Sequence, residues 1–533
     1  MKKIFVYLSI VPGLLLASCE DYLDLQPEDV IESNHYWETA NASALEQYCN
    51  TFYPKLIIGQ GNPNTDGAIE FISKDCQSDN IYSTGANTIA WGQNLVSTSD
   101  SQWSWSIIRG CNEFLDNYMK SPAVESAKNQ CAGEIYFFKA MDYFNKVMRF
   151  GDVPWYTHPL DTDSPELYKG RDSRYIVMDS ILMCLDKAIE LMPKKSDVTR
   201  VSKDAALALK ARVCLFEGTW RLYRDLEGSE KFLREAYNAA GELMKPEYGY
   251  SLYNTGEKPY YNLFIQDNYI GNSEVILSKE YDASINMGHD ISRGLPLSNY
   301  GMSRDCFEEY LCARTGLPIS LCSCHKNKSS SIEMRQRDPR LLQTICNPAD
   351  GDDCYYLWKT VNGKRVGGAP NIFSYMQGTD DRPYYGTSTT GYCIAKYYNP
   401  DEYVDLRFQG SVDSPIFRYA EILLIRAEAG AELGEDPELD KTINLLRQRA
   451  GLTFMLSANP PAEGEDPDMI EKYPIIKGPN AWLIREIRRE RRVELFGEGL
   501  RYMDILRWHA GDLLNRPKRG AKSNMYTAQE LSY

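Results

Sequence analysis

The chain has 533 residues with a formal net charge of −15, and 43% of its residues are hydrophobic. This acidic balance excludes a nucleic-acid-binding protein, because neutralising phosphates requires clustered Lys and Arg side chains. The hydrophobic content suffices for a sizeable core, and the aromatic content of 12%, with 37 Tyr and 9 Trp, permits carbohydrate binding as well as packing between helices.

The first residues have the features of an export signal. Lys2 and Lys3 precede an apolar run from Ile4 to Ala17 that is too short for a normal membrane span. The run closes on Leu16-Ala17-Ser18-Cys19, which resembles a bacterial lipobox. We therefore expect residues 1–18 to be a lipoprotein signal peptide and Cys19 to carry the lipid anchor. An acidic stretch that resembles a surface-export signal of Gram-negative lipoproteins follows: Glu20, Asp21 and Asp24.

Beyond this signal, apolar residues recur mainly at the spacing of amphipathic helices. The pattern predicts helices from Cys131 to Gly151, from Tyr175 to Pro193, from Lys203 to about Trp220 and from Lys231 to Met244. Two further helix pairs are predicted from Ile416 to Gly451 and from Asn480 to Trp508.

A weak internal repeat connects these helices. Phe138-Lys139-Ala140, Leu209-Lys210-Ala211 and Ile425-Arg426-Ala427 each place an apolar residue, a base and a small Ala in mid-helix, and the latter two are followed by Gly218 and Gly434. Paired helices with a small residue at the close approach resemble tetratricopeptide units, which stack to share a core. We therefore expect a mainly α fold, with a scaffold of stacked tetratricopeptide-like helix pairs over about 35–250 and 416–510.

Residues 254–415 have a different composition, rich in Gly, Pro, Asn and Tyr, and their sequence pattern predicts few helices. We expect a short strand from Glu274 to Lys279 and an extended run at Tyr397-Tyr398. Since no linker or low-complexity tract divides the chain, residues 19–533 are expected to form one domain with a long loop-rich insertion. Such an insertion on a rigid scaffold is a typical place for binding residues.

Cysteines are numerous but give no clear metal motif. Of 14 Cys, six lie between Cys306 and Cys354. Cys322-Ser323-Cys324-His325 suggests zinc, yet zinc sites usually have two clean ligand pairs, so unpaired thiols or a loop disulfide are favoured. Calcium at Asp350, Asp352 and Asp353 has no EF-hand pattern to support it, and a solvated acidic turn is favoured. We expect no cofactor and no metal.

The C-terminal segment from Arg485 to Arg507 holds seven Arg and five acids. Glu490 with Glu494, and Arg488 with Arg492, lie one helical turn apart and can form ion pairs across neighbouring helices. This charge balance favours a role in stabilising the scaffold over catalysis or polyanion binding.

The same segment, read from Ile487 to Trp508, is similar to the closing motif of the SusD/RagB family. Other stretches similar to that family occur in order along the chain: Cys19 to Asp24 with Pro27, Phe138 to Pro154, Arg337 to Arg340, Thr390 to Tyr392 before Lys396-Tyr397, and Arg418 to Ile422. The resemblance implies a lipid-anchored outer-membrane protein that faces the cell surface, binds a nutrient, commonly a glycan, and covers a SusC-like TonB-dependent transporter.

Site residues of that family vary too much to be transferred by motif, so candidates rest on loop position and chemistry. The first loop offers a stacking surface beside groups that bind hydroxyls, at Asp79, Asn80, Tyr82, Trp91 and Asn94; for Trp91, ligand contact and packing stay equally open. A second cluster in the insertion comprises Tyr281, Asp282, Asn286, His289, Asn299 and Tyr300, of which Tyr281, Asn299 and Tyr300 are the candidates. Trp358, with Tyr355 and Tyr384, forms a third.

Two other classes of function stay open. A surface glycoside hydrolase needs two carboxylates at a set separation, and none of the 74 acids is marked as such a pair. Motifs of other enzymes, such as H-E-x-x-H and G-x-S-x-G, are absent from the sequence. A protein-interaction scaffold is the other class, because stacked helix pairs often bind peptides. The resemblance also leaves open a peptide-binding lid of the same kind of transporter, because the family includes peptide binders. The favoured function is non-catalytic binding of an oligo- or polysaccharide and its delivery to the transporter.

Overall fold

A computed structural model describes residues 33–521, apart from 65–69, 84, 86, 298–299, 326–333, 335, 346–357, 362–363, 368–387, 400–401 and 403–406. Within these ranges, helices dominate and strands are few and short. None of the helices in this part of the chain has the length and apolar character needed to cross a membrane.

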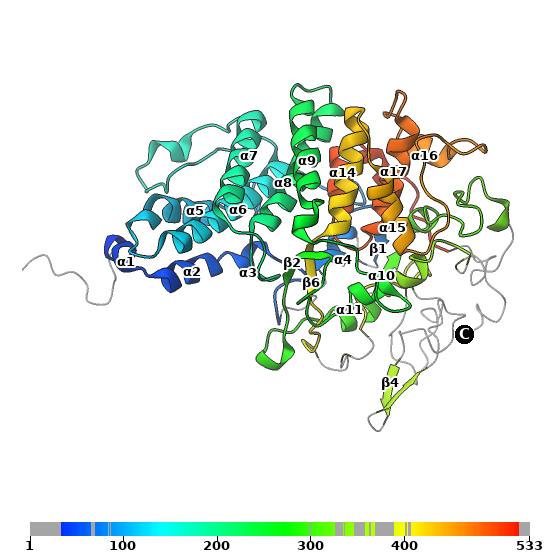
Figure 1. The fold of residues 1–533 in the computed structure, drawn as a ribbon, viewed down its shortest axis with the longest axis horizontal. Coiled ribbons are helices and arrows are strands. Elements are labelled where there is room, and N and C mark those ends of the chain that lie inside the picture. Colours follow the sequence, from blue (N-terminus) through cyan, green and yellow to red (C-terminus); the bar gives the residue numbers. More distant parts are fainter. Residues whose placement is uncertain are drawn as a thin grey trace, which may run out of the picture.

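The elements follow one another in three groups (Figure 1). The first group is α1 (Ser33–Thr39), α2 (Ala42–Asn50), α3 (Tyr53–Leu56), α4 (Glu70–Asp75), β1 (Ile81–Tyr82), α5 (Ser106–Asn117), α6 (Glu125–Phe150), α7 (Arg174–Leu191), α8 (Lys203–Leu222) and α9 (Ser229–Leu243). The second is α10 (Pro259–Leu263), β2 (Val275–Lys279), α11 (Ile291–Leu297), β3 (Gly301–Met302), α12 (Arg304–Phe307), β4 (Trp358–Val361), β5 (Lys364–Gly367) and β6 (Ser414–Arg418). The third is α14 (Tyr419–Leu433), α15 (Ile443–Arg449), α16 (Pro467–Lys472), α17 (Ala481–Glu494) and α18 (Arg501–Arg507).

The longer helices stack as a series of neighbours, which confirms the predicted mainly α fold. Each of α5, α6, α7, α8 and α9 contacts the next, and α9 then contacts α14, which contacts α17. Figure 1 shows α9, α14 and α17 side by side, although the second group of elements separates α9 from α14 in the sequence. The scaffold therefore continues across the insertion.

Helix α8 illustrates why these segments form and stack. The Ser202 side chain accepts a hydrogen bond from the backbone N–H of Ala205 and so caps the start of the helix. Near its end, a Cβ atom at Gly218 would lie 2.8 Å from the backbone nitrogen of Leu233 in α9. A residue larger than glycine at position 218 would therefore clash with α9 where α8 packs against it.

The insertion leaves and rejoins the scaffold at one place. Strand β2 pairs with β6 in antiparallel fashion, with Val275 opposite Arg418 and Lys279 opposite Ser414. The strand predicted at 274–279 is present, but residues 416–418 belong to β6, so the helix predicted from Ile416 begins only at Tyr419. Tyr397 is a further difference, since its φ of 71° places it in a turn and not in an extended run.

Helix α17 connects the two hydrophobic cores. Its Ile487 lies in the core formed by the stacked helices, whereas Val493 lies in the core of the insertion. The Arg and Glu residues of α17 are buried as well, and they form the expected ion pairs with neighbouring segments. Glu494, for example, pairs with Arg340 of the insertion and with Arg418 at the end of β6. The charged motif therefore fixes the insertion onto the scaffold.

Candidate functional site

The base of the first candidate loop is held by arginines of the C-terminal motif. Arg501 donates through Nε to Asp79 Oδ1 at 2.7 Å and through Nη2 to Asp79 Oδ2 at 3.0 Å. Arg492 lies 2.9 Å from Asp79 and donates through Nε to Asn80 Oδ1 at 2.8 Å. Burial opposes ionisation of Asp79, but these two guanidinium groups outweigh it and hold its pKa below the ordinary value.

Asp79 and Asn80 are therefore buried anchors of the loop, and we do not retain them as ligand contacts. Their oxygens satisfy arginines that α17 and α18 bring inside the protein, where an unpaired charge is costly. The sequence did contain one signal of this role. The motif from Arg485 to Arg507 has more Arg than acids, so it requires acidic partners from elsewhere in the chain.

Above this base, β1 and β3 bring the first two candidate clusters together. Tyr82 lies opposite Gly301 in the antiparallel pair, which places the half-buried Tyr300 next to the same short sheet. A Cβ atom at Gly301 would clash with the hydroxyl groups of Thr390 and Ser388, so glycine permits their close approach. Tyr82 and Tyr300 thus lie in one region of the fold.

Two further residues lie beside Tyr82. Thr389 Oγ1 donates to the backbone oxygen of Tyr82 at 2.9 Å, and the exposed Lys518 places Nζ 5.5 Å from the centre of its ring. Both are more than three hundred positions from Tyr82 in the chain. No local pattern marks them, because only the tertiary fold brings them to β1.

Farther along the loop, a hydrogen-bonded turn carries Trp91. Asn87 Oδ1 accepts from the backbone N–H groups of Ile89 and Ala90, and the Asn87 carbonyl accepts from the N–H of Trp91. Ala90 is buried and anchors the turn, whereas the Trp91 side chain is 53% exposed. Asn94 is exposed just beyond it. The turn therefore presents the aromatic ring of Trp91 to solvent on a fixed backbone.

Tyr281, a candidate of the second cluster, lies inside the protein. Tyr281 is buried, and its hydroxyl donates to the carbonyls of Ile58 and Gly61 at 3.1 and 2.7 Å. Its ring packs edge-on against His289, whose pKa burial lowers to about 4. We therefore do not retain Tyr281 as a ligand contact.

Some sequence-based candidates lie outside the described residues. Trp358 begins strand β4, which pairs with β5, but its side chain is not among the described ones. The remaining ones are Cys19, Asn299, Asp350, Asp352, Asp353, Tyr355 and Tyr384.

A buried carboxyl group beneath Tyr281 makes stability depend on pH. Asp413 Oδ1 accepts the Tyr281 backbone N–H at 2.9 Å, and burial raises the pKa of Asp413 to about 8, with Glu280 and Asp267 adding to the effect. Between about pH 4 and pH 8 the folded state keeps a proton that the unfolded chain has lost, so the free energy of unfolding falls as pH rises, by at most about 1.4 kcal/mol per pH unit.

We expect Asp413→Asn to remove this contribution, because asparagine resembles the neutral acid in shape. Urea unfolding at pH 5 and pH 8 should show a smaller fall in stability for Asp413→Asn than for wild type. The exposed Asp512→Asn serves as control and should follow wild type. Parallel pH profiles for wild type and Asp413→Asn would contradict the assignment.

Comparison with known proteins identifies the family. The model of the SusD family matches residues 273–533, and a second model, described as starch-binding associating with outer membrane, matches residues 21–215. SusD-like protein P38 of Formosa agariphila is 24% identical over 546 residues, an alignment that covers 95% of this chain and 92% of the relative.

Solved structures of the same type share the fold. A SusD-like carbohydrate binding protein from Bacteroides fragilis superimposes with a TM-score of 0.69 at 23% identity, covering 90% of this chain and 88% of the other. A laminarin binding SusD-like protein gives a TM-score of 0.57 at 19% identity, covering 92% and 97%. With the two family models spanning most of the sequence from residue 21 onward, this chain belongs to the SusD family.

Proposed function

We propose that this protein binds an oligo- or polysaccharide without chemical change, through a surface that includes Trp91, Asn94, Tyr82 and Tyr300. The observation that carries the proposal is the exposed indole on the turn at residues 87–92. Among the tryptophans whose side chains the structure describes, Trp91 is the exposed one, whereas the others are buried or half-buried.

The chemistry of this surface suits a neutral sugar. An indole face covers the apolar C–H face of a sugar ring, and the Asn94 amide can donate to and accept from hydroxyl groups. The turn is held by the Asn87 side chain and by the buried Ala90, so little conformational freedom is lost when a ligand binds. Lys518 and Thr389 supply further polar groups beside Tyr82.

The relatives support a glycan as cargo. One structure with the same fold is a carbohydrate binding protein and another binds laminarin, and the family model that matches residues 21–215 is described as starch-binding. We infer that a glycan is the cargo of this chain as well.

A non-catalytic role agrees with the state of Asp79, the buried acid at the base of the first loop. Asp79 is ionised between Arg492 and Arg501, and so it is neither a proton donor nor a free nucleophile.

We further propose where the protein acts. Cleavage after Ser18 and lipidation of Cys19 anchor one domain, residues 19–533, in the outer membrane, facing the cell surface. The tether keeps bound glycan next to a SusC-like TonB-dependent transporter and raises the local concentration of cargo at its entrance. Delivery then requires movement of the protein relative to the transporter and not a reaction at the sugar.

Affinity electrophoresis tests the proposal. Native gels that contain a neutral polysaccharide, such as a β-glucan, xyloglucan or starch, should slow the wild-type protein relative to a non-binding protein of similar mass. Unchanged migration in every polysaccharide gel would contradict glycan binding.

A further inference from the structure

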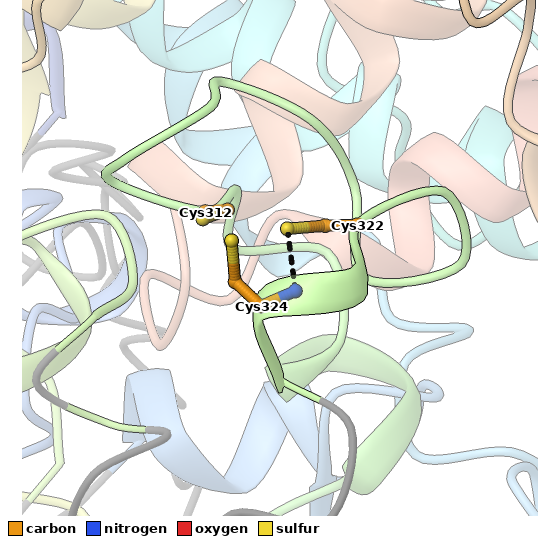
Figure 2. Close-up of side chains that lie close together, drawn as sticks. All are labelled: Cys312, Cys322 and Cys324. Carbon is orange, nitrogen blue, oxygen red and sulfur yellow. Dashed lines mark hydrogen bonds between the residues drawn. The ribbon is translucent and has the colours of Figure 1, made fainter.

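Three cysteine sulfurs converge in the insertion, at a place that the glycan surface does not use. The Sγ atoms of Cys312, Cys322 and Cys324 all lie within 4.8 Å of one another. Figure 2 shows the three side chains directed into the same space, Cys312 from one limb of a loop and the other two from the start of the 3-10 helix η6 (Ser323–His325) and the residue before it. We propose that these cysteines form a three-thiolate binding site for a thiophilic metal ion such as Zn²⁺.

The loop that joins the three cysteines has a defined conformation. The N–H of Cys312 donates to the Leu317 carbonyl at 2.9 Å, and its carbonyl accepts from the N–H of Gly316 at 2.8 Å. Gly316 has a φ of 69°, and a Cβ atom there would lie 2.5 Å from the Phe454 side chain. The turn that holds Cys312 is therefore tight and packed.

The other limb is tied to the scaffold. The N–H of Cys322 donates to the Pro318 carbonyl at 3.0 Å, and Ser320 Oγ donates to Asp466 Oδ1 at 2.6 Å. Asp466 also accepts a 2.6 Å hydrogen bond from Arg489 of α17. Both limbs are thus fixed before any ion binds, which lowers the cost of assembling a site.

The sulfur of Cys322 has hydrogen-bond donors around it, as metal-binding thiolates usually have. Its sulfur accepts hydrogen bonds from the Thr315 hydroxyl and from the backbone N–H of Cys324, both at 3.4 Å. The second of these is drawn in Figure 2. Donors of this kind stabilise negative charge on sulfur and orient it, which is the role of outer-shell groups in metal sites.

The arrangement of the sulfurs favours a metal ion over a disulfide. A disulfide joins two sulfurs and leaves the third without a function, whereas here all three thiols are free and meet at one point. A tetrahedral ion with metal–sulfur bonds of about 2.3 Å holds its sulfurs roughly 3.8 Å apart, within the observed limit. Soft thiolates select ions such as Zn²⁺ and Cu⁺.

Three ligand atoms meet at this site among the described residues. The fourth position of a tetrahedral ion is then filled by water or by a ligand outside this set. Cys312 and Cys322 are buried, whereas Cys324 is half-exposed and gives the ion a path from solvent. We therefore expect the bound ion to exchange with ions in solution.

Titration of the reduced full-length protein with Zn²⁺ or Co²⁺ tests the site. Zn²⁺ binding is measured by competition with a chromophoric chelator, and Co²⁺ binding by thiolate-to-metal charge-transfer absorption. We expect one tight ion per chain, lost in Cys322→Ser. Cys306→Ala, which removes a buried cysteine of the same insertion outside the cluster, should keep it. Circular dichroism reports whether each variant folds.

Thr315 provides a test that does not remove a ligand. Thr315→Val deletes the donor to Cys322 with little change of shape and should weaken Zn²⁺ binding about tenfold or more, whereas Thr315→Ser should keep it. Equal Zn²⁺ affinity in wild type, Cys322→Ser and Thr315→Val would overturn the proposal. So would a disulfide between any two of the three cysteines, found by mass spectrometry in protein isolated without reductant.

Discussion

Replacing Arg418 by methionine is expected to lower the free energy of unfolding by about 3–5 kcal/mol, the loss typical of breaking a buried ion pair by removing one partner. Arg418 is buried at the end of β6, where the insertion rejoins the scaffold. Guanidinium-induced unfolding measures the effect.

The size of this effect follows from the contacts of Arg418. Its five N–H donors all have acceptors: Nε and Nη2 donate to Glu498, Nη1 to Glu274 and Glu494, and Nη2 also to the backbone carbonyl of Glu494, at 2.7–2.8 Å. Methionine would leave three buried carboxylates short of a positive partner. Burial alone would raise the pKa of Glu494, but the positive charges of Arg449, Arg418 and Arg340 outweigh burial and lower this pKa below its ordinary value. The ionised form of Glu494 therefore depends on these arginines.

Two variants serve as controls for Arg418→Met. Arg418→Lys keeps the charge but not the planar fork, and we expect an intermediate loss. Arg149→Met removes an exposed partner of Asp100, where both side chains contact solvent, and should cost under about 1 kcal/mol. If Arg418→Met were as stable as Arg149→Met, the ion pairs of α17 would not be what holds the insertion in place.

Replacing Trp91 by alanine is expected to weaken glycan binding about tenfold or more, equivalent to about 1.4 kcal/mol or more, while the protein keeps its fold. The indole is 53% exposed, so its removal leaves no cavity in either core and should change stability by less than about 0.5 kcal/mol. Calorimetric titration with the glycan found by affinity electrophoresis measures the loss of binding.

Trp91→Phe and Tyr168→Ala separate stacking from general effects of losing an aromatic side chain. Phenylalanine keeps a stacking face and should recover part of the affinity. Tyr168 is 87% exposed and lies in the segment between α6 and α7, outside the proposed surface, so its replacement should leave binding unchanged. Equal affinities of wild type and Trp91→Ala would remove Trp91 from the site.

The scaffold was predictable from sequence because long amphipathic helices carry a local signal. The predicted helix over 203–220 corresponds to α8 (Lys203–Leu222), and the one over 231–244 to α9 (Ser229–Leu243). The error at 416–418 has a different origin. These residues directly precede a helix and carry no stop signal, and only their pairing with β2, more than 130 residues earlier, makes them a strand.

The exposure of the candidate side chains was predictable only where it is decided by the local sequence. Trp91 is followed by Gly92 and polar residues, and it does lie at the surface. Asp79 and Tyr281 occur in similar loop sequences but are buried by tertiary contacts. The sequence does not reveal this, because their partners Arg501 and Gly61 are 422 and 220 positions away. Cys312 likewise meets Cys322 and Cys324 through a loop conformation that spacing alone does not reveal.

Capture of a glycan without chemical change can be measured by calorimetric titration of the wild-type protein with a panel of oligosaccharides and peptides, followed by chromatography of the same samples. We expect saturable binding of at least one oligosaccharide, which is recovered intact. Cleavage of that oligosaccharide, or binding of peptides alone, would contradict it.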